Sequence, residues 1–69
     1  LFAMPTQLTQ RQLDVLRLIS AQYSTAQIAE TLHLSVNTVE THRKNLFKKL
    51  GAKNAVGLVK IAIEQHLLE

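Results

Sequence analysis

A helix-start signal occurs twice in the first half of this sequence, and it limits the fold more than any other feature. Thr9 is followed three residues later by Gln12, and Ser24 is followed at the same spacing by Gln27. A hydroxyl residue and a glutamine at this spacing form the capping box of a helix N-terminus, because each side chain satisfies the other's backbone N–H. Apolar residues then recur at intervals of three and four, as in a helix that packs one face against a core. The sequence therefore predicts two consecutive helices.

Two further helices are expected in the second half of the chain. Ser35 is a favourable N-cap and Gly51 is a favourable residue just past a C-terminus, so one long helix is predicted between them. Asn54 can cap a last helix. The four predicted helices cover about residues 10–21, 25–33, 36–50 and 55–66. Because no alternating run with turn signals argues for a sheet, the predicted fold class is all-α, a four-helix domain.

The chain has 69 residues and no cysteine, which leaves room for one small domain without disulfides or thiolate metal sites. Leu1 stands where a methionine would begin a complete protein, so we expect a piece of a longer one. Residues 1–7 contain Pro5 and no apolar period, and we interpret them as a linker end or a cloning remnant. Residues 8–69 are the predicted domain. Its apolar stretches are far shorter than the ~20 residues that span a bilayer, so we expect a soluble, cytoplasmic protein without a membrane partner.

The positive charge of the chain is concentrated in one segment. The net charge is +3, but residues 40–53 alone carry +4 and the remainder carries −1. A short helix, a turn of about three residues and a longer basic helix is the layout of a helix-turn-helix, whose second helix enters the major groove of DNA. The helix predicted at 36–50 is therefore the candidate recognition helix.

The candidate recognition helix has an apolar stripe and a polar face. The stripe is expected to face the core, and it comprises Val36, Val39, Leu46, Phe47 and Leu50. The polar face carries Asn37, Glu40, Thr41, Lys44 and Lys48. The N-terminal half of such a helix usually reaches base edges, so we assign base reading to Glu40, Thr41 and Lys44. Their groups suit a cytosine amino group, a thymine methyl or base edge, and guanine O6 and N7, respectively.

Phosphate contacts are expected from the polar groups around these base readers. The candidates are Thr25, Ser35, Asn37, Thr38, Arg43, Lys48 and Lys49. The alternative is that the polar face of this helix is simply a solvated surface.

The last predicted helix is apolar nearly all round. Leu58 and Ala62 are expected to face the core, and Gly57 would permit close approach of a second helix. The residues expected to face a symmetry mate are Val56, Val59, Lys60 and Ile63. Two such copies would read half-sites roughly 10 bp apart. The alternative is a terminal helix buried within its own domain.

Enzymatic and metal-binding functions have no support in the motifs. His33, His42 and His66 lie on different predicted elements, without cysteine partners or the H-E-x-x-H spacing of a zinc helix. The sequence lacks a glycine-rich phosphate loop and a nucleophile elbow. We therefore expect no enzyme, metal or cofactor. Two binding functions compete with DNA readout: a protein-interaction adaptor that uses the basic and the last helix, and RNA binding, which the scarcity of aromatic residues disfavours.

Four short motifs occur in order along the chain: Leu8-Thr9-Gln10-Arg11-Gln12, Ile28-Ala29-Glu30-Thr31-Leu32, Asn37-Thr38-Val39-Glu40-Thr41-His42 and Lys49-Leu50-Gly51. Together they resemble the DNA-binding domain of LuxR-type regulators, also called the NarL/FixJ output domain. The resemblance runs from about Leu8 to Leu68. It implies a bacterial transcription regulator with helices two and three as the helix-turn-helix and helix four as the dimerisation element.

The resemblance also implies partners and residue roles. The partners would be double-stranded promoter DNA, a second copy of the chain, an N-terminal receiver or ligand-sensing domain in the full-length protein, and RNA polymerase. With a receiver, the protein would be the response regulator of a two-component system. The family's positions that match Glu40, Thr41 and Lys44 commonly face bases, and those that match Thr38 and Lys49 commonly contact phosphate.

Several residues depart from the family pattern. Gln12 stands where the family usually has Glu. Gln22 stands where the family usually has Gly, and His33 stands where it often has Gly. We therefore expect positive φ at Gln22 and His33. Ala55 and Gly57 replace a frequent Arg and Glu, and Gly57 is expected to cost up to about 1 kcal/mol of helix stability relative to Ala.

Overall fold

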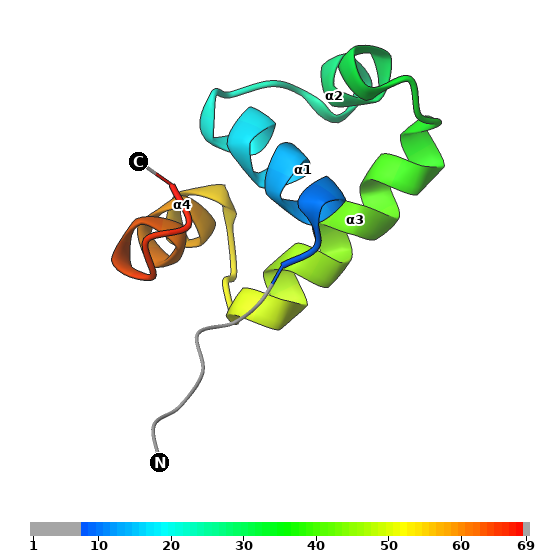
Figure 1. The fold of residues 1–69 in the computed structure, drawn as a ribbon. Helices are drawn as coiled ribbons and strands as arrows, with labels where there is room; N and C mark the ends of the chain where they lie inside the picture. Colours follow the sequence, from blue (N-terminus) through cyan, green and yellow to red (C-terminus); the bar gives the residue numbers. More distant parts are fainter. Residues whose placement is uncertain (1–7, 69) are drawn as a thin grey trace.

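The computed structural model describes residues 8–68, which form four α-helices and no strand (Figure 1). The helices are α1 (Gln10–Ser20), α2 (Thr25–Leu32), α3 (Val36–Leu50) and α4 (Ala55–Glu64). The predicted all-α fold class is confirmed, and α4 ends two residues earlier than expected. The interpretation of residues 1–7 as a linker falls outside the described residues.

Local hydrogen bonds begin each helix. Both predicted capping boxes are present, and their four bonds measure 2.8 to 3.1 Å. Ser35 Oγ accepts from the Thr38 N–H at 3.0 Å, and Asn54 Oδ1 accepts from the Gly57 N–H at 2.7 Å. Each cap satisfies an N–H that has no partner inside its helix. The starting points of the helices are therefore set by residues within three positions of each cap.

The four helices also end in the same way. A left-handed residue lies one position past α2 and α3 and two positions past α1 and α4. In each case the N–H of the following residue donates to the carbonyl five residues back, at 2.8 to 3.0 Å. This is the Schellman arrangement. The left-handed residues are Gln22, His33, Gly51 and His66, with φ of 69°, 58°, 70° and 60°. Positive φ at Gln22 and His33 is confirmed, whereas His66 was not expected to adopt it.

All four helices contribute to one core around the α1–α3 pair. The buried apolar residues are Val15, Leu16, Ile19, Ile28, Ala29, Val39, Leu46, Leu50, Leu58 and Ala62. Both α2 and α4 pack against α1 and α3, and within residues 8–68 they do not contact each other. Figure 1 shows them on different sides of the central pair. The core therefore fixes α3 and α4 with different faces toward solvent.

The predicted apolar stripe of α3 is correct except at one end. Val39, Leu46 and Leu50 are buried and Phe47 is half-buried, but Val36 is 48% exposed. Val36 is the first residue of α3, so no earlier turn of its own helix lies beside it. At 100° per residue it also lies at the edge of the stripe that Val39 and Leu46 define. The expectation that Val36 faces the core is therefore wrong.

Candidate nucleic-acid interface

Helices α2 and α3 are joined by residues 33–35, and the joint holds them at a fixed angle. His33 supplies the left-handed turn, and the Leu34 N–H donates to the Ala29 carbonyl at 2.9 Å. The Leu34 side chain packs against the core, and Ser35 caps α3 immediately afterwards. Each residue of the joint thus takes part in a contact that helps to orient α3 relative to α2. This is the helix-turn-helix arrangement that the sequence predicts.

The outer face of α3 is polar along its whole length. The five residues expected on the polar face, from Asn37 to Lys48, are all exposed. The arrangement places donors, acceptors and cations on a cylinder that a major groove can admit. The predicted polar face is thus available to a partner.

The three predicted base readers lie together in one shallow hollow of α3. Glu40, Thr41 and Lys44 line it with Arg43 and Phe47. The Arg43 guanidinium carbon lies 5.7 Å from the centre of the Phe47 ring, which is a cation–π contact. This contact restrains Arg43 at the edge of the hollow. The sequence analysis missed it, although the spacing of four residues on one helix is a usable signal.

Two hydroxyls of α3 have partners within the domain. Thr41 Oγ1 donates to the Asn37 carbonyl oxygen at 3.1 Å. Ser35 Oγ donates to Thr38 Oγ1 at 2.8 Å. Both threonines are exposed, and a hydroxyl proton can rotate toward a bound partner. Each hydroxyl can therefore donate to, or accept from, a phosphate or a base edge.

The predicted phosphate contacts fall at four places. Thr25 begins α2 and is half-buried, whereas Ser35, Asn37 and Thr38 at the start of α3 are exposed. The half-buried Arg43 lies mid-helix, and Lys48 and Lys49 occupy the last turn, where cations favour the negative end of the helix dipole. The structure thus spreads these groups over the start of α2 and the length of α3 rather than gathering them at one point.

Lys49 has a contact that the sequence analysis missed. Its Nζ lies 3.5 Å from Gln12 Oε1, the atom that also accepts from the Thr9 N–H in the α1 capping box. The two residues are 37 positions apart, and no local pattern signals the approach. The contact links the end of α3 to the start of α1 and holds Lys49 on the flank of the recognition helix.

The cations of α3 are not neutralised by nearby acids. The only ion pair within residues 8–68 joins Arg11 and Asp14 at 3.9 Å, at the start of α1. Lys44 and Glu40 are one turn apart, yet they do not pair within 4.0 Å. The positive charge of residues 40–53 is therefore directed to solvent, where it can attract a polyanion.

The α4 residues that the sequence assigns to a symmetry mate share one surface. Val56, Val59, Lys60 and Ile63 all line a hollow between α4 and the end of α1. Val56 is 80% exposed and Ile63 is 55% exposed, whereas Leu58 and Ala62 on the opposite side are fully buried, as expected. We call these four residues the α4 face.

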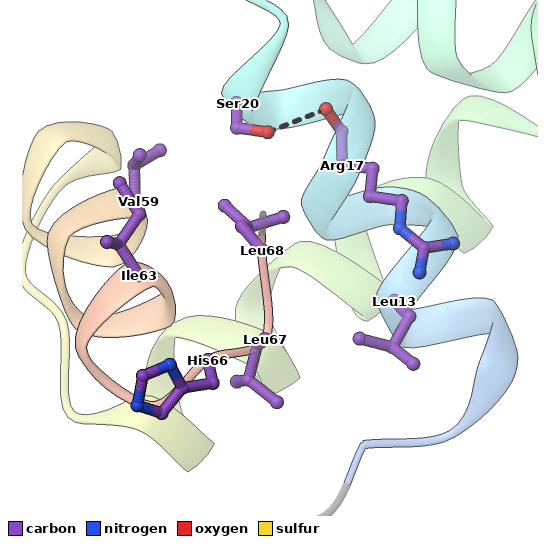
Figure 2. A pocket seen from close by; sticks show the side chains of 8 residues that line it. All are labelled: Leu13, Arg17, Ser20, Val59, Ile63, His66, Leu67 and Leu68. Carbon is purple, nitrogen blue, oxygen red and sulfur yellow. Dashed lines mark hydrogen bonds between the residues drawn. The ribbon is translucent and has the colours of Figure 1, made fainter.

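A second hollow adjoins the α4 face (Figure 2). It measures about 780 Å³, and its lining is mostly aliphatic: Leu13, Arg17, Ser20, Val59, Ile63, His66, Leu67 and Leu68. Figure 2 shows the guanidinium of Arg17 pointing away from Val59 and Ile63. Because those two residues line both hollows, the apolar surface continues from α4 toward α1. The sequence analysis did not find this hollow.

Two further properties concern only the described residues. Residues 8–68 contain no group of three or more His, Asp or Glu side chains placed to hold a metal ion. In the same part of the chain, no helix has both the length and the apolar character needed to cross a membrane.

Comparison with known families now identifies this helix-turn-helix. The family described as bacterial regulatory proteins, luxR family, matches residues 6–62. The chain belongs to the LuxR family. It is a LuxR-type helix-turn-helix domain of a transcription regulator, which confirms the resemblance in the sequence, and the family is not a class of enzymes.

Relatives of this LuxR-family domain include two named regulators. The transcriptional regulatory protein MctR of Rhizobium johnstonii is 48% identical over 61 residues, which is 88% of this chain and 28% of MctR. The oxygen regulatory protein NreC of Staphylococcus aureus is 44% identical over 62 residues, which is 90% of this chain and 29% of NreC. The chain therefore spans less than a third of the length of these relatives.

Two solved structures share the fold. ChrA, the response regulator of a heme-sensing two-component system, superposes with a TM-score of 0.86 at 29% identity, covering 96% of this chain and 33% of ChrA. VqmA of Vibrio cholerae, a LuxR-type receptor described as a DNA-binding dimer, superposes with a TM-score of 0.83 at 29% identity. That match covers 90% of this chain and 28% of VqmA.

Proposed function

We propose that this LuxR-type domain binds double-stranded DNA sequence-specifically, with α3 in the major groove, and thereby regulates transcription in the bacterial cytoplasm. One observation carries the proposal: α3, the second helix of the helix-turn-helix, exposes a polar face whose cations make no ion pair within residues 8–68. The three predicted base readers lie together on this face. In this arrangement Glu40, Thr41 and Lys44 meet base edges, because they lie on the second and third turns of α3.

The surrounding polar groups position α3 on the sugar–phosphate backbone. Thr38 has an exposed hydroxyl, and Arg43, Lys48 and Lys49 carry positive charge toward solvent. Thr25, Ser35 and Asn37 lie at the starts of α2 and α3, where free N–H groups also favour phosphate. These contacts supply affinity and register, and the base readers supply specificity.

The α4 face is proposed to pair two copies on DNA. Two largely exposed aliphatic side chains, Val56 and Ile63, are its main support. A two-fold pair would hold two α3 helices about one helical turn of DNA apart. The remaining partners follow from the family: an N-terminal receiver or ligand-sensing domain in the full-length protein, and RNA polymerase.

The experiment that tests this function is selection of duplexes from a random library by the purified domain, at a stated near-physiological salt concentration. The expected result is a repeated motif with half-sites about one turn apart. The matched variant is Ile63→Asp, which places a charge in the α4 face and leaves α3 untouched. Because Ile63 is 55% exposed, the variant should fold, and it should select a single half-site in place of the repeat.

Recovery of no motif, with only salt-sensitive retention of any duplex, would contradict the proposal. The protein-interaction adaptor would then be favoured, because an adaptor for acidic proteins does not discriminate among duplexes, whereas a specific reader prefers its site about 10³-fold or more.

A further inference from the structure

One side-chain oxygen of α1 meets donors from two different helices. Gln12 Oε1 accepts from the Thr9 N–H at 3.0 Å in the α1 capping box, and Lys49 Nζ at the end of α3 lies 3.5 Å from the same oxygen. A backbone N–H and an ammonium group only donate, so the amide meets both of them with its oxygen. The oxygen that faces Lys49 is therefore held in place by the start of α1.

Lys49 lies on the flank of α3 that carries another predicted phosphate contact. At about 100° per residue, its position is about 20° around the helix axis from that of Thr38. Both residues are exposed. An α-helix in the major groove has a sugar–phosphate backbone along each flank. Gln12 thus reaches α3 on a side where a cation can meet a phosphate.

The amide of Gln12 attracts Lys49 without neutralising its charge. An ammonium group has three N–H donors, so after one has bound Gln12 the other two remain for a phosphate. Binding to DNA gains affinity from each phosphate that a cation neutralises, because counterions are released. A carboxylate at the same place would form an ion pair with Lys49 and compete with the phosphate. A neutral acceptor therefore suits a lysine that binds a polyanion.

We propose that Gln12 is a positioning residue for DNA binding, which holds Lys49 against the α1 side of α3, ready to contact a phosphate with its full charge. This inference rests on the proposed function, because it requires α3 to lie in the major groove. A lysine that is held before binding loses less conformational entropy when DNA arrives. Helix α1, which lies outside the helix-turn-helix, thereby takes part in DNA binding through Lys49.

The test combines Gln12 variants with Lys49→Ala and measures DNA affinity at several salt concentrations. Gln12→Glu keeps the capping box, because a carboxylate also accepts from the Thr9 N–H, and it brings an ionic partner to Lys49. With Lys49 present, Gln12→Glu should weaken binding to every duplex about fivefold and lower the slope of log affinity against log salt by up to about one unit. In the Lys49→Ala background, it should weaken binding less than about twofold, through screened repulsion alone, and leave the slope unchanged.

A second variant removes the amide oxygen and adds no charge. Gln12→Met keeps the approximate length of the side chain, but it cannot hold Lys49 through a hydrogen bond to oxygen. With Lys49 present, it should lower DNA affinity about threefold and leave the salt slope unchanged, because the lysine keeps its charge. In the Lys49→Ala background it should have no effect on affinity.

Gln27→Glu is the matched control, because it makes the same change at the same position of the α2 capping box. Within residues 8–68 the Gln27 side chain bonds to the Ser24 N–H and makes no hydrogen bond to a lysine. The loss of affinity that Gln27→Glu causes should therefore be the same with and without Lys49. Circular dichroism and thermal unfolding check that every variant folds.

The inference is overturned if Gln12→Glu weakens binding equally in both Lys49 backgrounds, or if it leaves the salt slope of the chain with Lys49 unchanged. It also fails if Lys49→Ala by itself changes neither affinity nor slope, and in that case sequence-specific binding through the rest of α3 still stands. Absence of any preferred duplex for the wild-type chain would instead overturn the proposed function, and the inference with it.

Discussion

The α3 face and the α4 face rest on the same core, yet they present opposite chemistry. On α3 the core buries or half-buries every apolar residue except Val36, and the other exposed residues are polar or charged. On α4 the core uses Leu58 and Ala62, and aliphatic side chains remain exposed on the other side, with Val56 at 80% and Ile63 at 55%. A hydrated, cationic face is compatible with a polyanion. An exposed aliphatic face is stabilised only when another apolar surface covers it and removes it from water. One small domain thus carries two faces that suit different classes of partner.

The largest expected effect tests whether the two faces depend on one core. Leu46 beneath α3 and Leu58 beneath α4 are both fully buried. Leu46→Ala and Leu58→Ala should each lower the free energy of unfolding by about 2 to 5 kcal/mol, because each removes buried methyl groups and leaves a cavity. Urea unfolding followed by circular dichroism measures the change. In a domain this small, DNA binding should be lost in both variants. Retention of full DNA affinity by Leu58→Ala would show that α4 is separable from the rest of the fold.

Removing one lysine charge from each face should distinguish the two faces by the salt dependence of DNA binding. Lys48→Ala and Lys60→Ala remove the same charge from exposed positions on α3 and α4. Lys48→Ala should weaken binding to every duplex about fivefold and lower the slope of log affinity against log salt by about one unit, because one phosphate contact is lost. Lys60→Ala should leave the slope unchanged. Titrations at several salt concentrations check both results, and equal slopes for the two variants would contradict the assignment of the DNA-binding face to α3.

The smallest expected effects concern the two glycines, where the same substitution should have opposite signs. Gly51 ends α3 with φ of 70°, and a Cβ there would meet no atom within 4 Å. Gly51→Ala should therefore lower the free energy of unfolding by roughly 1 kcal/mol through backbone strain alone. Gly57 lies inside α4, and a Cβ there would lie 3.4 Å from Asn54 Oδ1, an ordinary contact. Gly57→Ala should raise the free energy of unfolding by up to about 1 kcal/mol.

Thermal unfolding of both alanine variants, with dimerisation on DNA measured in parallel, checks these signs. If Gly57 provides close approach for a second copy, Gly57→Ala should weaken the pairing even as it stabilises the domain. Unchanged pairing would show that the α4 face meets its partner through Val56 and Ile63 without contact at the glycine.

The sequence by itself determined the helices and their order. Caps act within three residues of each helix start, and the Schellman ends act within five, so Thr9, Ser24, Ser35 and Asn54 could be recognised without any tertiary information. The apolar period likewise placed Val39, Leu46, Leu58 and Ala62 in the core. The left-handed residue at His66 escaped notice because histidine, unlike glycine, is no sequence signal for that conformation.

Only the tertiary structure decided which side chains are free. Val36 follows the apolar period, yet it is exposed because the core does not extend beneath the first residue of α3. The approach of Lys49 to Gln12 joins residues 37 positions apart. The second hollow, which adjoins the α4 face, is lined by residues of α1 and by residues near the C-terminus. Such contacts depend on how distant segments pack against each other, and the pattern of residue types along the chain does not specify that packing.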